Sequence, residues 1–225
     1  MTDQSKRSRD QDLEWRGDVP VSRQFDDPYY SLDDGVAETW HVFLAGNDLP
    51  DRFCDGFHIA ELGFGTGLNL LVALQAFRAA GIPGKLRYTS FEAFPLPLEA
   101  MQQAQRPFKE LAALAQELAP QWGASEITLQ DLEFRLIVGD ARDRLPNTDL
   151  VADAWFLDGF SPAKNPELWD ADLLRAVGEH TAPGGTCATY TAAGHVRRAL
   201  DAAGFEISRV PGFGRKRHMS VGRRR

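Results

Sequence analysis

A chain of 225 residues, 43% of them hydrophobic, is long enough to bury the core of one α/β domain, and a second full domain would not fit. Its apolar runs are short and its first ten residues are polar, so the sequence predicts a cytoplasmic protein with neither a membrane span nor a secretory signal. The net charge of −7 argues weakly against a nucleic-acid partner, and the two cysteines and five histidines lack the spacing of metal ligands or of a disulfide framework.

The N-terminal part of the chain differs in composition from the rest. Residues 1–18 are predicted to form a disordered tail. Residues 19–56 are richer in turn residues and aromatic residues, such as Phe25 and Tyr29, and this composition predicts an appended hairpin or lid. We therefore expect the main domain to occupy residues 57–225.

From residue 57 onward, strand-like apolar runs alternate with helical patterns, which is typical of βαβ units and a mostly parallel sheet. Predicted helices follow the glycines at 63–67 as far as Gly81, surround residues 111–118, and run from Asn165 to about His180 and from about His195 to Ala203. The predicted strands cover residues 57–62, 86–91, 134–138, 154–157, 186–191, 205–210 and 218–221, the last of them antiparallel. Seven core strands of this kind predict a Rossmann-like α/β fold.

A glycine-rich turn follows the first predicted strand. Gly63, Gly65 and Gly67 stand where the backbone of an open parallel sheet approaches a ligand, although a GxGxG pattern alone is a weak signal. Leu68 occupies the position of the third glycine of the dinucleotide fingerprint, which argues against a nicotinamide or flavin site. Glu61, two residues before the first glycine, instead favours S-adenosylmethionine as the cofactor.

Three further predicted strands each end at a carboxylate, namely Glu92, Asp140 and Asp158. The cofactor presents a ribose diol and an adenine amino group that donate hydrogen bonds, as well as cationic sulfur and amine centres. We expect all three to be cofactor-binding residues, with Glu92 at the ribose, Asp140 at the adenine and Asp158 next to the reacting methyl group. For each acid the alternative is a carboxylate that caps the next helix or lies in a loop.

Several short segments carry a resemblance to a known family. They are Pro20-Val21-Ser22, Phe25-Asp26-Asp27, Glu38-Thr39, residues 43–50, residues 63–69, Ser90-Phe91-Glu92, residues 153–166 and residues 212–217, of which 153–166 is the most specific. On these segments the chain from Val19 onward resembles the MnmC-type enzymes, which make 5-methylaminomethyl-2-thiouridine at the wobble position of tRNA. Phe64 and Asn69, inside the matching glycine segment, join the predicted cofactor-binding residues.

The resemblance implies a class I methyltransferase fold and a specific reaction. The methyl group of S-adenosylmethionine would pass to the aminomethyl nitrogen of wobble 5-aminomethyl-2-thiouridine. The best-known members of the family also carry a FAD-dependent oxidase domain, which this chain is expected to lack. A separate oxidase or another upstream tRNA-modifying enzyme would then supply the substrate.

The residues in and near the 153–166 segment are predicted to contact the acceptor. Asp158 is the predicted catalytic residue, chiefly by positioning the amine and secondarily by accepting its proton. Phe160 would stack on the uracil ring, or else pack beneath the loop. Lys164 would contact a phosphate, or else be a solvated loop lysine.

The C-terminal end of the chain is basic. From Gly194 to Arg225 there are nine Lys or Arg residues and two acidic residues, a net charge of +7, which leaves −14 on the rest of the chain. A basic end on an acidic body is typical of a protein that contacts phosphates with one face, although the last three arginines can equally form a solvated tail. We expect the anticodon stem-loop of tRNA to contact Arg197, Arg198, Arg215, Lys216 and Arg217.

Three alternatives to this function stay open on the sequence. The first is an N-methyltransferase of the same fold that acts on a different amine. The second is a non-catalytic RNA-binding module that has kept the fold, against which the intact glycine turn and acids argue. The third is a nicotinamide dehydrogenase, which the position of Leu68 disfavours.

Overall fold

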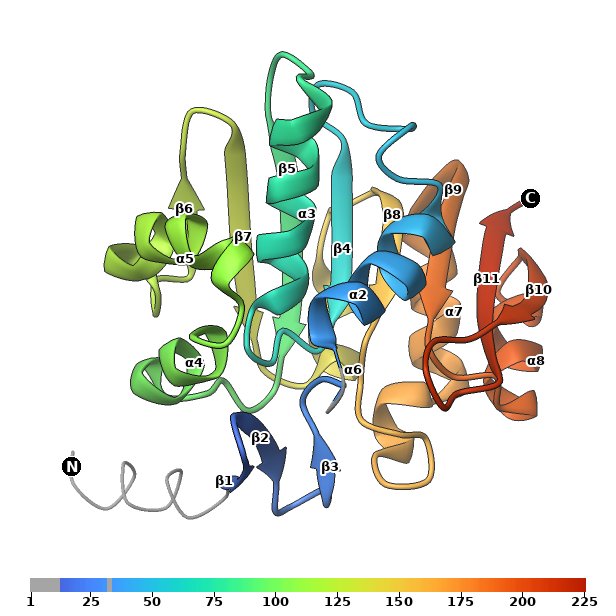
Figure 1. Ribbon diagram of the computed structural model, residues 1–225. Coiled ribbons are helices and arrows are strands. Elements are labelled where there is room, and N and C mark those ends of the chain that lie inside the picture. Colours follow the sequence, from blue (N-terminus) through green and yellow to red (C-terminus); the bar gives the residue numbers. More distant parts are fainter. Residues whose placement is uncertain (1–12, 32–33) are drawn as a thin grey trace.

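The computed structural model describes residues 13–31 and 34–225 (Figure 1). Within these residues the strands form two sheets, one of three strands in the order β1-β2-β3 and one of eight strands in the order β10-β11-β9-β8-β4-β5-β7-β6. The pairings β9-β8, β8-β4, β4-β5 and β5-β7 are parallel, whereas β6 and β11 pair antiparallel with their neighbours. The expected Rossmann-like α/β fold with a mainly parallel sheet is confirmed.

The elements have the following bounds. The strands are β1 (Leu13–Arg16), β2 (Val19–Ser22), β3 (Asp27–Pro28), β4 (His58–Leu62), β5 (Leu86–Glu92), β6 (Glu126–Thr128), β7 (Leu132–Val138), β8 (Ala152–Leu157), β9 (Thr181–Thr189), β10 (Phe205–Pro211) and β11 (His218–Arg224). The α-helices are α2 (Gly35–Thr39), α3 (Leu68–Ala80), α4 (Leu98–Gln105), α5 (Ala112–Leu118), α6 (Ala141–Arg144), α7 (Ala171–Glu179) and α8 (Gly194–Ala202). Shorter helical turns are η1 (Trp40–Leu44), η2 (Ala45–Asn47), η3 (Lys109–Leu111), η4 (Ala119–Gln121), η5 (Leu145–Asn147) and η6 (Pro166–Trp169).

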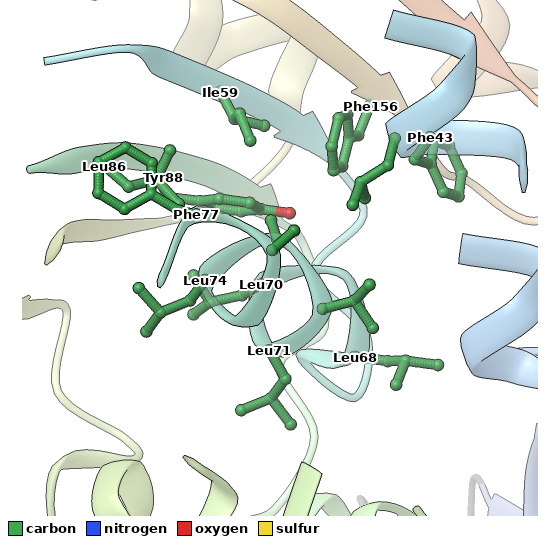
Figure 2. Packing of buried hydrophobic residues seen from close by; sticks show 14 of the residues in the cluster. Phe43, Ile59, Leu68, Leu70, Leu71, Leu74, Phe77, Leu86, Tyr88 and Phe156 are labelled. Atoms are coloured by element: carbon green, nitrogen blue, oxygen red, sulfur yellow. The ribbon is translucent and has the colours of Figure 1, made fainter. Parts of the chain in front are cut away.

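Successive residues of a strand point to opposite faces of the sheet. Because apolar residues lie on both faces of the large sheet, helices cover both. On one face Ile59 and Phe156 belong to the same buried cluster as Leu70 and Phe77 of α3, an arrangement that Figure 2 shows from close by. On the other face Trp155 is fully buried in a second cluster that includes residues of α7 and α8. The strands therefore lie between two apolar layers, which hold the ends of the parallel strands in fixed positions.

Helix α3 directly follows the predicted glycine turn. Gly67 precedes it with a φ of 73° and Gly81 follows it with a φ of 65°, so both ends use the left-handed conformation that glycine tolerates. Its 13 residues are too few to cross a bilayer, and no helix in residues 13–31 and 34–225 is long and apolar enough to do so. The predicted end of this helix at Gly81 is confirmed.

The structure corrects three sequence predictions in the main domain. The large sheet has an eighth strand, β6, which is only three residues long and lacks an apolar run. The helix predicted from Asn165 is interrupted at Asp170, whose extended backbone separates η6 from α7 and whose side chain accepts the backbone N–H groups of Asp172 and Leu173. Strand β9 begins at Thr181 and not at Thr186, because Pro183-Gly184-Gly185 belongs to the strand beside a bulge.

The N-terminal segment comprises the described residues before Phe57. Its strands β1, β2 and β3 form a small sheet at the end of the large sheet toward which the parallel strands point (Figure 1). The tail predicted for residues 1–18 is wrong over its last part, because Leu13–Arg16 form β1 and pair antiparallel with β2, while residues 1–12 lie outside the described residues. The hydroxyl of Tyr30 lies 2.9 Å from the carbonyl oxygens of both Asp18 and Ala104, which share its one proton, and the contact with Ala104 joins this segment to the main domain.

Candidate active site

A cavity of about 810 Å³ lies where β4, β5 and β8 end. Its wall combines the glycine turn, the ends of these strands, the N-terminal segment and the turn between β10 and β11. Ligands of open parallel sheets bind at this edge, beyond the carboxyl ends of the strands. Of the predicted site residues, those that line the cavity are Gly63, Phe64, Gly65, Asn69, Glu92, Asp140, Asp158, Phe160, Arg215 and Lys216.

The glycine turn passes so close to the end of β8 that side chains are excluded. A Cβ atom on Gly63 would lie 2.1 Å from the carbonyl oxygen of Asp158, and Gly63 has a φ of 89°. A Cβ atom on Gly65 would lie 3.1 Å from the ring of Tyr29, at a φ of 52°. The two glycines therefore let the backbone of the turn pack closely against its neighbours, Gly63 against Asp158 and Gly65 against Tyr29 of the N-terminal segment.

Asn69, in the first turn of α3, joins two carboxylates. Its Nδ2 donates to Oε1 of Glu61 at 2.9 Å and to Oδ2 of Asp158 at 2.7 Å. The hydroxyl of Ser90 donates to the other oxygen of Glu61 at 2.7 Å, and the hydroxyl of Thr39 donates to Oδ1 of Asn69 at 2.8 Å. The amide of Asn69 is thus fixed at both ends and orients Asp158 toward the cavity.

Burial shifts the pKa of both carboxyls upward. It raises the pKa of Glu61 to about 8, against the opposing hydrogen bonds from Ser90 and Asn69. It raises the pKa of Asp158 to about 7, where the Asn69 hydrogen bond opposes the shift, the charge of Glu38 adds to it and the charge of Lys216 reduces it. Asp158 can therefore gain or lose a proton near neutral pH.

Glu92 and Asp140 both line the cavity but differ in their partners. Glu92 accepts the backbone N–H of Gly65 at 3.0 Å and that of Phe94 at 2.8 Å, so its carboxylate is held in place by the turn that it faces. Asp140 caps α6 through the backbone N–H of Arg142 at 2.9 Å and binds the guanidinium of the same residue at 2.6 Å. The hydrogen bond from Arg142 lowers the pKa of Asp140, so this carboxylate is ionised.

Aromatic rings form part of the cavity wall. Phe160 stacks on Phe25 with 4.8 Å between the ring centres, and the ring of Tyr29 meets Phe160 edge-on at 5.0 Å. Phe94 lies 6.1 Å from Phe25 and is 57% exposed, an unusual exposure for so large an apolar ring. The packing role and the stacking role considered for Phe160 are both compatible with this position.

A second acidic group faces the cavity from the N-terminal segment. Glu38, in α2, binds Nζ of Lys216 at 2.8 Å. The same Nζ lies 3.9 Å from the centre of the Tyr190 ring, and the hydroxyl of Tyr190 donates to the carbonyl oxygen of Gly159 at 2.7 Å. Lys216, predicted to contact tRNA phosphates, is therefore turned into the cavity.

The remaining predicted site residues lie outside the cavity wall. Glu61 is fully buried behind Asn69, and Gly67 is the residue directly before α3. Lys164 is fastened to the N-terminal segment by Asp26 and by Asp27, whose Oδ1 lies 3.6 Å from its Nζ. Arg197 and Arg198 lie on α8, and Arg217 lies at the end of the β10-β11 turn. Glu61 and Lys164 thus contact residues of the cavity wall, whereas Arg197, Arg198 and Arg217 do not line the cavity.

Sequence reasoning assigned no role to Glu38, Tyr29 or Tyr190. Tyr190 directly follows strand β9. Functional residues often lie just after parallel strands, so its position in the sequence could have identified it. Neither Glu38 nor Tyr29 follows a predicted strand, and only the family resemblance of the segment Glu38-Thr39 pointed to Glu38; the packing of the N-terminal segment brings both residues to the cavity.

Comparisons with known proteins agree with this geometry. A family described as S-adenosyl-L-methionine-dependent methyltransferase matches residues 104–225. Two proteins named tRNA 5-methylaminomethyl-2-thiouridine biosynthesis bifunctional protein MnmC, from Stutzerimonas stutzeri and Chromohalobacter salexigens, are 44% and 45% identical over 94% of this chain. The chain covers only 34% and 32% of the length of these relatives. The crystal structure of MNMC2 from Aquifex aeolicus superimposes with a TM-score of 0.75 at 28% identity, over 94% of this chain and 69% of that one.

Proposed function

The chain belongs to the family of S-adenosyl-L-methionine-dependent methyltransferases, and from this premise we propose that it methylates the aminomethyl nitrogen of wobble 5-aminomethyl-2-thiouridine in tRNA. The product would be 5-methylaminomethyl-2-thiouridine. The predicted enzyme class and the predicted cofactor are confirmed by the family match. The acceptor is part of the proposal, and its support comes from the names of the two relatives and from the acidic, aromatic end of the cavity.

The residues of the cavity fit the cofactor. The turn lines the cavity at Gly63, Phe64 and Gly65 and carries no side chain at either glycine, so its backbone can lie against a ligand there. We propose that Glu92 accepts hydrogen bonds from the ribose hydroxyls and Asp140 one from the adenine amino group, since both are acceptors on the cavity wall. S-adenosyl-L-methionine, when bound, supplies an electrophilic methyl group on a cationic sulfur.

The observation that carries the acceptor proposal is the arrangement of Asp158 and Glu38 beside stacked aromatic rings. Both carboxylates line one cavity, and Phe160 and Tyr190 border it. An alkylammonium ion binds to carboxylates and to aromatic faces, and a pyrimidine stacks on an aromatic ring. A pyrimidine that carries an aminomethyl group combines these two requirements.

Asp158 has two tasks in the proposed reaction. An alkyl amine has a pKa of about 10, and its protonated form has no lone pair with which to attack. The carboxylate of Asp158, held by Asn69 at 2.7 Å, would bind the ammonium and position its nitrogen. With a pKa of about 7, Asp158 would then take the proton, directly or through water, which frees the nitrogen lone pair.

A basic surface for the anticodon stem-loop is the second part of the proposal. Arg215 lines the cavity and Arg217 follows it in the same turn, and in the part of the chain that the structure describes neither is paired with an acidic side chain. Arg197 and Arg198 extend the basic charge along α8. A tRNA acceptor would be met in the cytoplasm, and a separate oxidase or another upstream enzyme would supply the aminomethyl group.

The test is a transfer assay with purified components. Protein and S-adenosylmethionine are incubated with an anticodon stem-loop that contains 5-aminomethyl-2-thiouridine, and the nucleosides are analysed by mass spectrometry. We expect one methyl group to be added to the aminomethyl nucleoside and none to a stem-loop with unmodified 2-thiouridine. Methylation of other amines, with the aminomethyl nucleoside left unchanged, would contradict the proposal.

A further inference from the structure

The turn between β10 and β11 places a cation of the protein itself in the acidic end of the cavity. Nζ of Lys216 lies 2.8 Å from a carboxylate oxygen of Glu38 and 3.9 Å from the centre of the Tyr190 ring. A carboxylate and the face of an aromatic ring are two groups that bind ammonium ions. Lys216 therefore marks a position where an alkylammonium ion is bound.

The two groups that hold this ammonium are fixed by the fold. Tyr190 is anchored at its hydroxyl, which donates to the carbonyl oxygen of Gly159, the residue after Asp158. Glu38 precedes Thr39, whose hydroxyl donates to Asn69, the residue that also binds Asp158. Tyr190 is thus connected to Asp158 through one hydrogen bond, to the neighbouring Gly159. Glu38 is connected to Asp158 through two hydrogen bonds, from Thr39 to Asn69 and from Asn69 to Asp158.

Lys216 is the movable member of the group. Its side chain is 44% exposed, whereas the side chain of Glu38 is 13% exposed. The base of the turn is held separately, because His41 hydrogen-bonds the carbonyl oxygen of Pro211 at 3.0 Å and its ring lies 5.9 Å from that of Phe213. The flexible four-carbon stem of Lys216 can swing toward solvent while the turn and the two binding groups stay in place.

We propose that Glu38 and Tyr190 form an ammonium-binding subsite beside Asp158, which Lys216 fills in the free protein and the protonated aminomethyl group of the acceptor fills on binding. This inference rests on the proposed function and deepens it. The acceptor amine arrives charged, replaces Lys216, and so comes to lie next to the carboxylate that takes its proton. The displaced ammonium of Lys216 moves toward solvent, to which its side chain is already 44% exposed.

This assignment makes a different prediction for Lys216 than a phosphate contact does. A phosphate contact attracts any RNA, so its removal weakens binding of all RNAs equally. A cation that competes for the amine subsite opposes only an acceptor that carries the aminomethyl group, so its removal strengthens binding of that acceptor alone. The ratio of the two affinities separates the two roles.

The experiment compares two anticodon stem-loops that differ only in the 5-aminomethyl group on wobble 2-thiouridine. Dissociation constants are measured by fluorescence anisotropy in the presence of S-adenosylhomocysteine, for the wild type, Lys216→Met, Glu38→Gln and Arg215→Met. Lys216→Met should increase the preference for the aminomethyl stem-loop by about three- to tenfold, and Glu38→Gln should reduce it by a similar factor. Arg215→Met, the control from the same turn, should weaken binding of both stem-loops equally.

The inference is overturned if Lys216→Met weakens binding of both stem-loops to the same degree, or if either variant at Lys216 or Glu38 leaves the preference of the wild type unchanged. Methyl transfer by the wild type is measured on the same aminomethyl stem-loop. Transfer together with an unchanged preference in the variants rejects the subsite alone. Absence of transfer, with no preference in the wild type, rejects the proposed function.

Discussion

The side-chain amide of Asn69 donates a hydrogen bond of 2.7 Å to the carboxylate of Asp158. The same nitrogen also donates to the fully buried Glu61, so one side chain at the start of α3 joins the ends of β4 and β8. The amide provides the donor that each carboxylate needs inside the protein. Stability and the orientation of the proposed catalytic group therefore depend on the same residue.

Asn69→Leu keeps the size of this side chain and removes its hydrogen bonds. We expect a loss of about 1–3 kcal/mol in the free energy of unfolding, because two buried carboxyls lose a donor. We also expect a fall in kcat of about 10- to 100-fold, because Asp158 loses its orientation. Urea denaturation and single-turnover transfer measure the two effects. Thr39→Val, which removes only the hydrogen bond to Oδ1 of Asn69, serves as the control and should have a smaller effect on both quantities.

Asp158→Asn removes the charge from the proposed amine-binding group and leaves its shape. We expect turnover to fall by at least about 100-fold, because the variant can neither hold the ammonium by charge nor accept its proton. The affinity for S-adenosylmethionine should change little, since the glycine turn and Glu92 are left intact. Radiolabel transfer and equilibrium binding are the measurements, and near-normal turnover would remove Asp158 from the chemistry.

Burial of Glu61 should make folding stability depend on pH. Its pKa is raised to about 8 in the folded protein, against a value of 4.5 for an unperturbed glutamate. A raised pKa stabilises the folded state fully below the unfolded value, and this contribution is lost as pH rises through the folded value. The free energy of unfolding should therefore decrease between about pH 4.5 and 8 in the wild type.

Glu61→Gln removes this titration and keeps the shape of the side chain. Its amide can accept from Asn69 and donate to Ser90, whose hydroxyl is able to do both. We expect a weaker decrease of stability over the same pH range, measured by urea denaturation at a series of pH values. Asp158 has a raised pKa as well, so some decrease should remain in the variant. A slope identical to that of the wild type would show that Glu61 does not titrate in this range.

Gly63→Ala should reduce stability much more than the same substitution at another glycine with a positive φ. Its new Cβ atom would lie 2.1 Å from the carbonyl oxygen of Asp158, so backbone must move. Gly123 has a φ of 94° but nothing within 4 Å of a Cβ atom, so Gly123→Ala isolates the conformational strain, about 1–2 kcal/mol. We expect Gly63→Ala to exceed this loss of stability and also to abolish cofactor binding. Equal losses in the two variants would show that the turn accommodates the added methyl group.

Charge reversal at Arg215 and Arg217 should weaken tRNA binding. For every phosphate that the protein no longer neutralises, the slope of log affinity against log salt should decrease in magnitude by about one. Lys164→Met is the matched control, because Lys164 already pairs with Asp26 and Asp27 and its charge is compensated. Filter binding over a range of salt concentrations measures the affinity for tRNA and its salt slope. If affinity and slope are unchanged after reversal of both arginines, the RNA does not bind to this turn.

The sequence determined the architecture of the main domain and the position of the strand ends at which we propose that the cofactor binds. Its strands and helices follow local patterns of apolar spacing, glycine and proline, and the functional residues predicted on that side directly follow strands that the pattern identified. Gly63, Glu92 and Asp158 were therefore found at the sheet edge where they were expected. The short strand β6 was missed because three residues with one buried side chain carry no periodic signal.

Only the tertiary structure decided which residues form the proposed acceptor side of the cavity. Glu38 and Lys216 are 178 residues apart in the chain, and no spacing rule connects an N-terminal helix with a C-terminal turn. Charge counting assigned Lys216 to a basic surface together with Arg215 and Arg217, because composition shows the number of charges and not the direction of a side chain. Packing of the N-terminal segment over the strand ends supplies the carboxylate that turns Lys216 inward, and long-range packing of this kind cannot be read from local sequence.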